Sequence, residues 1–252
     1  KALPTTEKQE LATIEARLFE ALDIKKAPRK DVSKAYNTFK TAAIRPSGNG
    51  FTGAPIVAPD ELNRQKGEIS LNDLEDMLSG FAYDACYNHS AQSMKNYFLV
   101  WDYAINQGFA FGSGMGTNHH YGYQIRKIYT TAWLMRDAIW KAPNRDNILS
   151  ALIFWSALQE TRIPYQYGRD ELLDSWHTLL MPKTISALMF VDERERARAL
   201  TGLSRWLSGS LQYSPGTIGG IKVDGTTFHH GGFYPAYTTG VLAMVGQFIA
   251  LT

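Results

Sequence analysis

The sequence is poor in the features that build disulfides, membrane spans and strongly charged surfaces. Its 252 residues include a single cysteine, Cys86, so neither an intrachain disulfide nor a cysteine-based metal site is expected. No run of eighteen apolar residues occurs, which argues against a membrane-spanning helix. The 26 lysines and arginines nearly balance the 24 aspartates and glutamates. This balance argues against a nucleic-acid-binding protein that neutralises phosphates, but it permits a local basic surface for an anionic polymer.

The chain also lacks an initiator methionine and a signal-peptide core at its start, and a helix stop signal at its end. It begins with the residues KALP and ends inside an apolar helical pattern. We therefore expect a mature or excised piece of a longer protein, cut at both ends.

Apolar residues recur at helical spacing along most of the chain. One such stripe comprises Leu11, Ile14, Leu18 and Leu22. Ser70 and Asp73 have the spacing of a helix cap and precede a second apolar face over 71–81. Further helices are expected over 94–105, 123–140, 147–158, 172–190, 193–207 and 240–251. No segment alternates with a period of two for long enough to require a sheet, so the sequence predicts an all-α fold.

Three segments rich in glycine, proline or asparagine are expected to be loops: 45–66, 108–116 and 214–220. Long glycine-rich loops in a compact helical domain are usually functional or disordered. The second leads directly into His119 and His120 and the third into the block that begins at Asp224 and carries His229 and His230, which favours function.

The segment 224–237, DGTTFHHGGFYPAY, concentrates polar rings among residues that break helices. It places His229 and His230 just before a glycine pair and Tyr237 seven positions after His230, and an apolar helical run follows from Val241 to Leu251. The glycines and Pro235 predict a shaped loop at a helix entrance. An imidazole and a phenol held there can move protons on and off carbon and oxygen.

A second block, TNHHYGYQIR at 117–126, carries Asn118, His119 and His120. Together the two blocks resemble the active-site segments of the polysaccharide lyases that cleave chondroitin, dermatan and hyaluronan, and are most similar to the chondroitin sulfate ABC lyases. The resemblance is clearest over 101–252. It implies that residues 1–252 are part of one catalytic domain, an incomplete (α/α) toroid of stacked helical hairpins with long loops over a cleft. It also implies flanking β-sandwich domains and a C-terminal remainder outside this chain, in a secreted or periplasmic bacterial enzyme.

The activity that the resemblance implies is β-elimination at a uronic acid of chondroitin or dermatan sulfate, with hyaluronan as a further candidate. This reaction needs a base for the C5 proton, neutralisation of the carboxylate and an acid for the departing O4. The products carry a 4,5 double bond, and no water is consumed.

The resemblance gives Tyr237 the central proton-transfer role and makes His230 the counterpart of the family's catalytic histidine. His229 and Tyr234 are expected to bind substrate. Because neighbouring side chains on an extended segment point to opposite sides, we expect His230 to face the cleft and His229 to pack behind it.

In the second block, His120 matches a histidine that the ABC lyases use in addition to the shared tetrad. Glucuronate and iduronate present the C5 proton on opposite ring faces, so a second base would let one enzyme accept both epimers. Asn118, whose amide has two donors, is expected to bind substrate together with His119 and Arg162. The family's tetrad also needs an arginine and a glutamate downstream of Tyr237, which we expect to lie outside this chain.

Two other functions remain open on the sequence. An (α/α) glycoside hydrolase would need two opposed carboxylates, for which Asp102, Glu160 and Asp224 are available. A non-catalytic polysaccharide-binding helical domain would not depend on the rings of either block. The partner that we expect is an anionic polysaccharide, a glycosaminoglycan by the resemblance, and no nucleic acid.

A zinc site is the least favoured interpretation of the histidines. The two pairs lack the spacing of a helical zinc motif, and no carboxylate lies beside either pair in the sequence unless Asp224 folds back. We therefore expect no metal ligands and no cofactor in the chemistry, with room for a structural calcium or magnesium ion.

Overall fold

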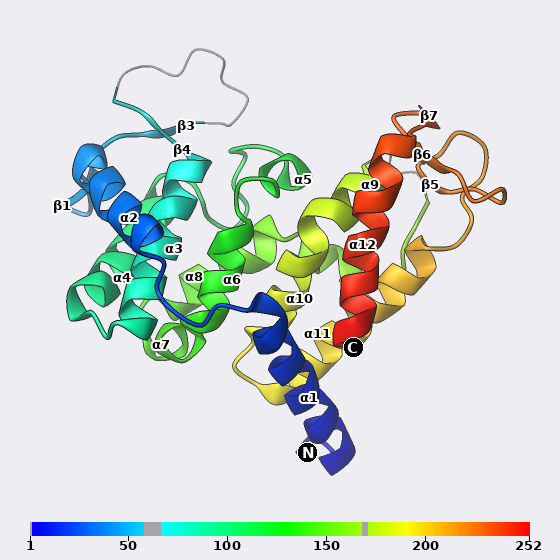
Figure 1. The fold of residues 1–252 in the computed structure, drawn as a ribbon, viewed down its shortest axis with the longest axis horizontal. Coiled ribbons are helices and arrows are strands. Elements are labelled where there is room, and N and C mark those ends of the chain that lie inside the picture. Colours follow the sequence, from blue (N-terminus) through cyan, green and yellow to red (C-terminus); the bar gives the residue numbers. More distant parts are fainter. Residues whose placement is uncertain (1, 58–66, 168–170) are drawn as a thin grey trace. The chain divides into compact units, whose positions relative to one another are not determined.

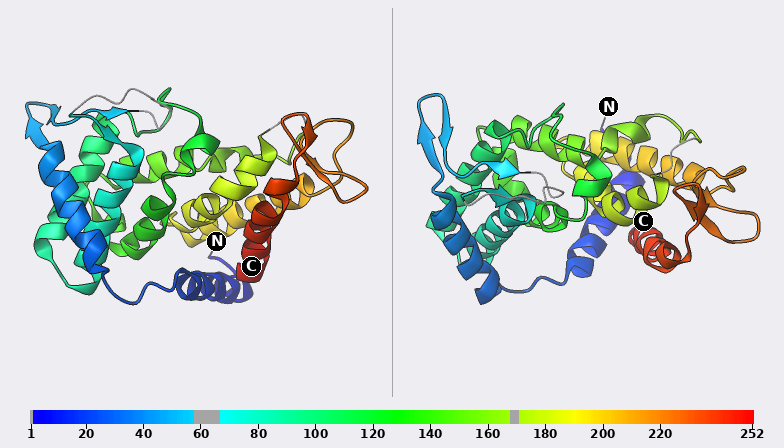
Figure 2. Two further views of the ribbon diagram at one scale, coloured as in Figure 1. Left: turned by 45° about the horizontal axis from the view of Figure 1, so that its top comes forward. Right: turned by 90° about the horizontal axis from the view of Figure 1, so that it is seen from above.

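The computed structural model describes residues 2–57, 67–167 and 171–252. Helices dominate these residues and the seven strands are two or three residues long, so the predicted all-α fold is confirmed. Within these ranges, none of the helices is long and apolar enough to cross a membrane. The chain divides into two compact units (Figure 1; Figure 2): an N-terminal unit of residues 22–117 and 121–155, and a C-terminal unit of residues 1–21, 118–120 and 156–252.

The N-terminal unit is a group of helices around α3. Its helices are α2 (Arg29–Ala42), α3 (Leu71–Tyr87), α4 (Ala91–Asn106), α6 (Arg126–Leu134), α7 (Arg136–Lys141) and α8 (Arg145–Trp155). The predicted cap of α3 is confirmed, because the backbone N–H of Asp73 donates to Ser70 Oγ at 3.2 Å and the Asp73 carboxylate accepts from the Ser70 N–H at 2.8 Å. Helix α3 packs against α2, α4 and α6, so its apolar face forms the centre of this unit.

Two expectations for this unit were incomplete. Helix α2 was not predicted, and the segment expected to be one long loop over 45–66 contains the hairpin of β1 (Arg45–Ser47) and β2 (Gly50–Thr52) and the strand β3 (Ile56–Val57), which pairs with β4 (Ile69–Ser70). The rest of that expected loop, 58–66, lies outside the described residues.

The single helix predicted over 123–140 is wrong, since the structure divides it into α6 and α7 at Met135. Buried Ile128, Ala132, Met135 and Ile139 keep helical spacing across the break. The apolar pattern is therefore continuous although the hydrogen-bonded helix is not. For this reason periodicity alone predicted α6 and α7 as one helix.

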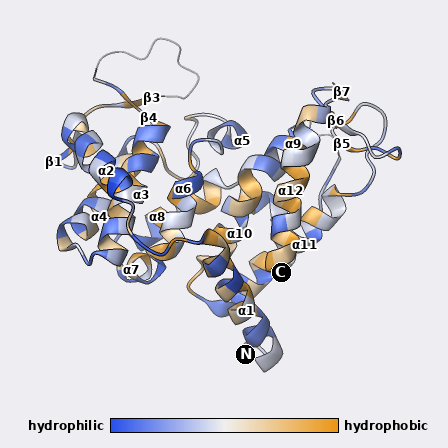
Figure 3. Cartoon of the chain, in the orientation of Figure 1, coloured by the Kyte–Doolittle hydropathy of each residue, from blue (hydrophilic) through white to orange (hydrophobic). Residues whose placement is uncertain are grey.

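The C-terminal unit carries its core on three helical stretches. Its helices are α1 (Thr5–Leu22), part of α5 (Asn118–Tyr121), the 3-10 helix η1 (Leu158–Arg162), α9 (Leu172–Asp174), the π-helical turn η2 (Ser175–Leu179), α10 (Leu180–Leu188), α11 (Glu193–Ser210) and α12 (Pro235–Leu251). Trp176, Trp206 and Phe248 are central to a core cluster formed by the segment 172–180, α11 and α12. The indole N–H of Trp176 donates to Ser210 Oγ at 2.9 Å, which fixes η2 to α11. Figure 3 shows how strongly apolar α12 is.

A small antiparallel sheet precedes α12. Strand β6 (Thr227–His229) pairs with β5 (Gly220–Ile221) on one side and with β7 (Gly232–Phe233) on the other. Helix α12 begins at Pro235 rather than near Gly240, and proline at the first helical position suits a helix start. The loop predicted over this segment is therefore a hairpin followed at once by a helix. The toroidal arrangement and the single-domain assignment of 1–252 stay predictions.

Candidate active site

The β6–β7 hairpin positions both histidines of the first block. His229 is opposite Gly232, so the turn consists of His230 and Gly231, whose φ angles are 52° and 74°. Positive φ at both residues is the conformation of a type I′ hairpin turn, which histidine tolerates better than most side chains. His229 is buried, with 1% of its surface exposed, whereas His230 is exposed.

The two imidazoles do not point to opposite sides, contrary to the expectation for an extended segment. Their ring centroids are 3.8 Å apart and the planes are tilted by 34°. The left-handed backbone of His230 turns its side chain back toward that of its neighbour. The hairpin therefore presents a pair of imidazoles in contact, with the inner ring covered by the outer one.

Tyr237 lies in the first turn of α12 and is half-buried. Its ring centroid is 5.0 Å from that of His229 and the planes are tilted by 32°. The hydroxyls of Thr227 and Thr238 lie 2.5 Å apart, and the N–H of Tyr234 donates to the carbonyl of Thr227 at 3.0 Å. These bonds join β6 to the start of α12, so the phenol is held against the imidazole pair.

Tyr234, immediately before α12, completes the ring cluster. Its centroid is 5.5 Å from that of His229, 6.3 Å from that of His230 and 5.2 Å from that of Tyr237, in edge-on arrangements. Its side chain is 39% exposed. Tyr234 therefore offers a ring face or hydroxyl to a ligand while bracing the two histidines.

Two further side chains beside this ring cluster were not predicted from the sequence. Asp174 ends α9 and is buried, and its Oδ2 lies 3.5 Å from Nε2 of His229. His177, in the π-helical turn, has its ring 6.0 Å from that of Tyr237. A π-helical turn is often found at functional sites, but periodicity cannot reveal one. The only sequence signal was the i, i+3 spacing of Asp174 and His177 inside an apolar helix.

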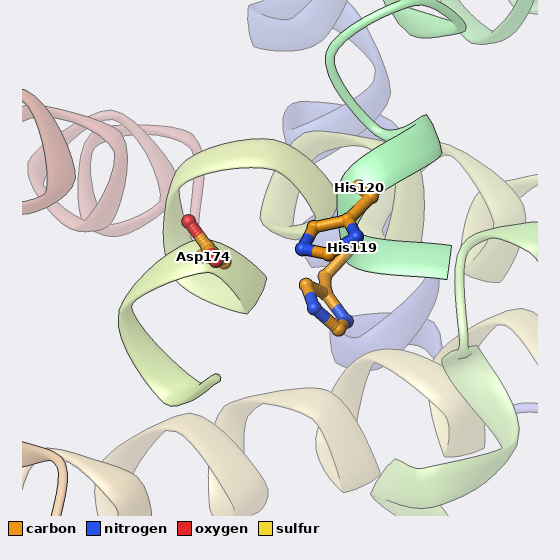
Figure 4. A group of neighbouring side chains, drawn as sticks. All are labelled: His119, His120 and Asp174. Atoms are coloured by element: carbon orange, nitrogen blue, oxygen red, sulfur yellow. The ribbon is translucent and has the colours of Figure 1, made fainter. Parts of the chain in front are cut away.

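The second histidine block reaches the same carboxylate. The hydroxyl of Thr178 lies 2.9 Å from the carbonyl oxygen of His119 and 3.0 Å from that of Asp174, which ties α5 to the segment that carries the aspartate. The rings of His119 and His120 are 4.3 Å apart, and both project from α5 on the side where Asp174 lies (Figure 4). Asn118, the first residue of α5, is half-buried.

The environment differs between the two histidines of α5. His120 is exposed, whereas His119 is half-buried. Burial, and secondly the neighbouring His120, lower the pKa of His119 below its ordinary value. His119 is therefore expected to be neutral at neutral pH, with one ring nitrogen available as an acceptor or ligand.

Asp174 lies among both histidine pairs and makes two groups with the donor set of a metal site. One group is His119, His120 and Asp174, and the other is Asp174, His229 and His230; in each, one ligand atom per residue lies within 4.8 Å of the others. This carboxylate comes from a distant part of the chain, so the residues beside either pair in the sequence did not reveal it. Asp224 does not fold back: its Oδ1 accepts from the N–H and hydroxyl of Thr226 in its own turn.

The remaining candidate residues have local partners elsewhere. Arg162 ends η1, and its carbonyl accepts from Arg205 at 3.3 Å; it is not among the side chains in the ring contacts of the described site. Glu160 forms an ion pair with Lys183 at 2.8 Å. Asp102, in the N-terminal unit, accepts from the amide of Asn144 at 2.5 Å. Asp102, Glu160 and Asp224 thus each take part in a local interaction of their own.

Contacts within the C-terminal unit thus bring the two blocks together. His120 and His230 each approach Asp174, which in turn approaches His229, the ring next to Tyr237. A phenol beside stacked imidazoles, with a buried carboxylate behind them, has the parts for proton transfer at an exposed ring edge. It is the kind of constellation that a proton-abstracting lyase needs.

An all-α chain with this ring cluster has the features of a helical lyase catalytic domain. The family described as "Lyase, catalytic" matches residues 1–252, and the chain belongs to that family. This confirms the resemblance seen in the two histidine blocks.

Curated relatives are similar over smaller shares of their own length. The chain is 35% identical over 154 residues to a chondroitin sulfate ABC exolyase of Bacteroides thetaiotaomicron, covering 60% of this chain and 15% of that protein. It is 26% identical over 245 residues to the chondroitin sulfate ABC endolyase of Proteus vulgaris, covering 89% of this chain and 24% of that protein. The chondroitin sulfate ABC exolyase of Proteus vulgaris is 31% identical over 185 residues, covering 69% and 18%. The chain therefore spans a quarter or less of the relatives it matches.

Proposed function

We propose that this chain is part of a glycosaminoglycan lyase that cleaves chondroitin and dermatan sulfate by β-elimination and gives 4,5-unsaturated products. The observation that carries the proposal is the contact of Tyr237 with His229, whose ring in turn contacts that of His230, in a chain of the lyase catalytic family. The proposed partner is an anionic polysaccharide, and the proposed location is outside the cell or in the periplasm. Hyaluronan is a further substrate to test.

In the proposed mechanism, Tyr237 is the proton-transfer residue. As phenolate it removes the C5 proton from glucuronate, and as phenol it protonates O4 of the departing sugar. Its ring lies beside His229 and near His177, so two imidazoles are its neighbours. His230, the exposed member of its pair, is the group that meets the uronate carboxylate and lowers the energy of the carbanion-like transition state.

His120 is the proposed base for iduronate. Its exposed ring stands on a different element from Tyr237 and approaches Asp174 from α5. Since the C5 proton changes ring face between the epimers, a base on a separate element can serve the face that Tyr237 does not reach. Asn118 and His119 beside it, and Tyr234 near His230, are proposed to hold the sugar. Arg162 remains a proposed substrate contact that only binding data can place.

The proposal does not make this chain sufficient by itself. The family's arginine and glutamate are proposed to lie beyond residues 1–252, so activity belongs to the longer protein. A glycoside hydrolase is disfavoured because Asp102, Glu160 and Asp224 are engaged in local interactions.

The test is to incubate the complete enzyme with chondroitin sulfate and with dermatan sulfate and to follow ultraviolet absorbance and reducing ends together. A lyase produces absorbance from the conjugated C=C–COO⁻ in step with chain cleavage. Reducing ends without absorbance would show a hydrolase, and neither signal on any glycosaminoglycan would contradict the proposal.

A further inference from the structure

The group formed by His119, His120 and Asp174 has a chemistry that proton transfer alone does not require. It offers two imidazoles and one carboxylate, with one ligand atom from each within 4.8 Å of the other two. Imidazole nitrogen and carboxylate oxygen are the donors that Zn²⁺ takes in sites with an open coordination position. Calcium and magnesium prefer oxygen ligands, so this donor set selects a transition ion against them.

The group is also held together before any ligand arrives. The Thr178 hydroxyl is within hydrogen-bond distance of the carbonyls of His119 and Asp174, at 2.9 and 3.0 Å, and so connects the two elements that supply the donors. Asp174 is 4% exposed and cannot swing freely into solvent. His120 is exposed, which gives an ion a path to the site.

The fit requires only small side-chain movements. Donor atoms around a tetrahedral Zn²⁺ lie about 3.4 Å apart, because each is about 2.0–2.1 Å from the ion. Closing the present spacing of up to 4.8 Å to that value needs rotation of exposed His120 and half-buried His119 toward a fixed carboxylate. The contacts of the Thr178 hydroxyl with the carbonyls of His119 and Asp174 need not break.

We propose that His119, His120 and Asp174 form a binding site for a divalent transition ion, with Zn²⁺ as the best match. The ion is coordinated by one nitrogen of each imidazole and by the Asp174 carboxylate, and water fills the open position. Binding removes the lone pair of His120 from proton transfer. The following consequence rests on the proposed function. Zinc inhibits cleavage of dermatan, for which His120 is the base, more strongly than cleavage of chondroitin, for which Tyr237 is the base.

Binding is measured first, without substrate, by titrating Zn²⁺ into the untagged, metal-stripped protein in a calorimeter. We expect one high-affinity site in the unaltered protein. Asp174→Asn and His120→Ala should each weaken that site at least tenfold, since even loss of an outer partner of a metal ligand costs about 10–100-fold. His89→Ala is the matched control, because His89 is an exposed histidine of the N-terminal unit and should leave binding unchanged.

Further variants locate the ion. His230→Ala removes a donor of the other group, which shares Asp174, and should leave zinc affinity within about threefold of the unaltered protein. Loss of binding in His230→Ala with retention in His120→Ala would overturn the proposal, as would equal affinity for Ca²⁺ and Zn²⁺ or unchanged binding in Asp174→Asn. Circular dichroism of each variant confirms that it is folded.

The inhibition is measured separately, as initial rates on the two polymers with and without added Zn²⁺. A preferential loss of dermatan cleavage that EDTA reverses is the expected result. Equal inhibition of both substrates would contradict the assignment to His120. An enzyme with no lyase activity at all would refute the proposed function, while the calorimetric result would still decide the metal site.

Discussion

Replacing Asp174 with asparagine is expected to slow elimination while leaving substrate affinity nearly unchanged. The carboxylate is buried behind His229, with Oδ2 3.5 Å from Nε2, and His229 in turn lies against Tyr237. Asparagine keeps the size and removes the charge. Asp174 therefore acts as a positioning residue, which holds the orientation of an imidazole that the substrate need not touch.

The magnitude follows from the burial of the pair. A hydrogen bond to a charged group contributes about 1.5–3 kcal/mol. If all of it is felt in the transition state, kcat falls about 10–150-fold, since about 1.36 kcal/mol corresponds to a tenfold change in rate. The effect should be seen on both chondroitin and dermatan, because Asp174 approaches both histidine pairs.

The assay is the initial rate of unsaturated product over a range of concentrations of each polymer, with EDTA present so that bound metal does not contribute. Thermal unfolding of the variant serves as the control for a damaged fold. A kcat within twofold of the unaltered enzyme would refute the reasoning, and so would a loss confined to KM.

Three further comparisons of variants test different parts of the account. His120→Ala should reduce dermatan cleavage far more than chondroitin cleavage, whereas His230→Ala should reduce both; equal losses in the two variants would make His120 a general binding residue. Gly116→Ala should destabilise the segment just before α5 by about 1–3 kcal/mol, because an added Cβ would lie 2.3 Å from the Tyr121 ring. Gly114→Ala is the control: an added Cβ there has nothing within 4 Å and should leave the melting temperature unchanged. Glu75→Gln should change how stability depends on pH: burial raises the pKa of Glu75 to about 7, so the unaltered protein loses stability as pH rises from about 4.5 to 7. The Gln variant should show a smaller loss over that range in urea unfolding, and Glu10→Gln, at an exposed position, should not.

The sequence predicted elements where local chemistry decides the structure. Two local signals define α3. Ser70 and Asp73 lie within one helical turn of each other and form its cap, and the apolar residues that follow repeat along one face of the helix. The start of α12 was misplaced, since the apolar pattern begins only at Val241 whereas Pro235 begins the hydrogen-bonded helix. The apolar pattern did not reveal the break at Met135, because Met135 is buried and keeps helical spacing with Ala132 before it and Ile139 after it.

The candidate site was harder to predict from the sequence than the fold, because Asp174, its central residue, is identified only by tertiary contacts. Nothing beside either histidine pair pointed to Asp174, which lies in a segment that reads as an apolar helix. The relation of His229 to His230 depends on a type I′ turn, whose positive φ angles reverse the expectation of opposite orientations. The histidine pairs and Tyr237 were chosen as candidates because the glycines and the proline around them are local signals of a shaped loop.

The central claim is that Tyr237 transfers protons in an elimination reaction. Tyr237→Phe keeps the ring that packs against His229 and the core, and removes only the hydroxyl. In the complete enzyme we predict a folded protein with normal melting temperature and at least about a hundredfold less unsaturated product from both chondroitin and dermatan sulfate. Near-normal formation of unsaturated product by this variant would show that another residue performs the chemistry, and would contradict the account.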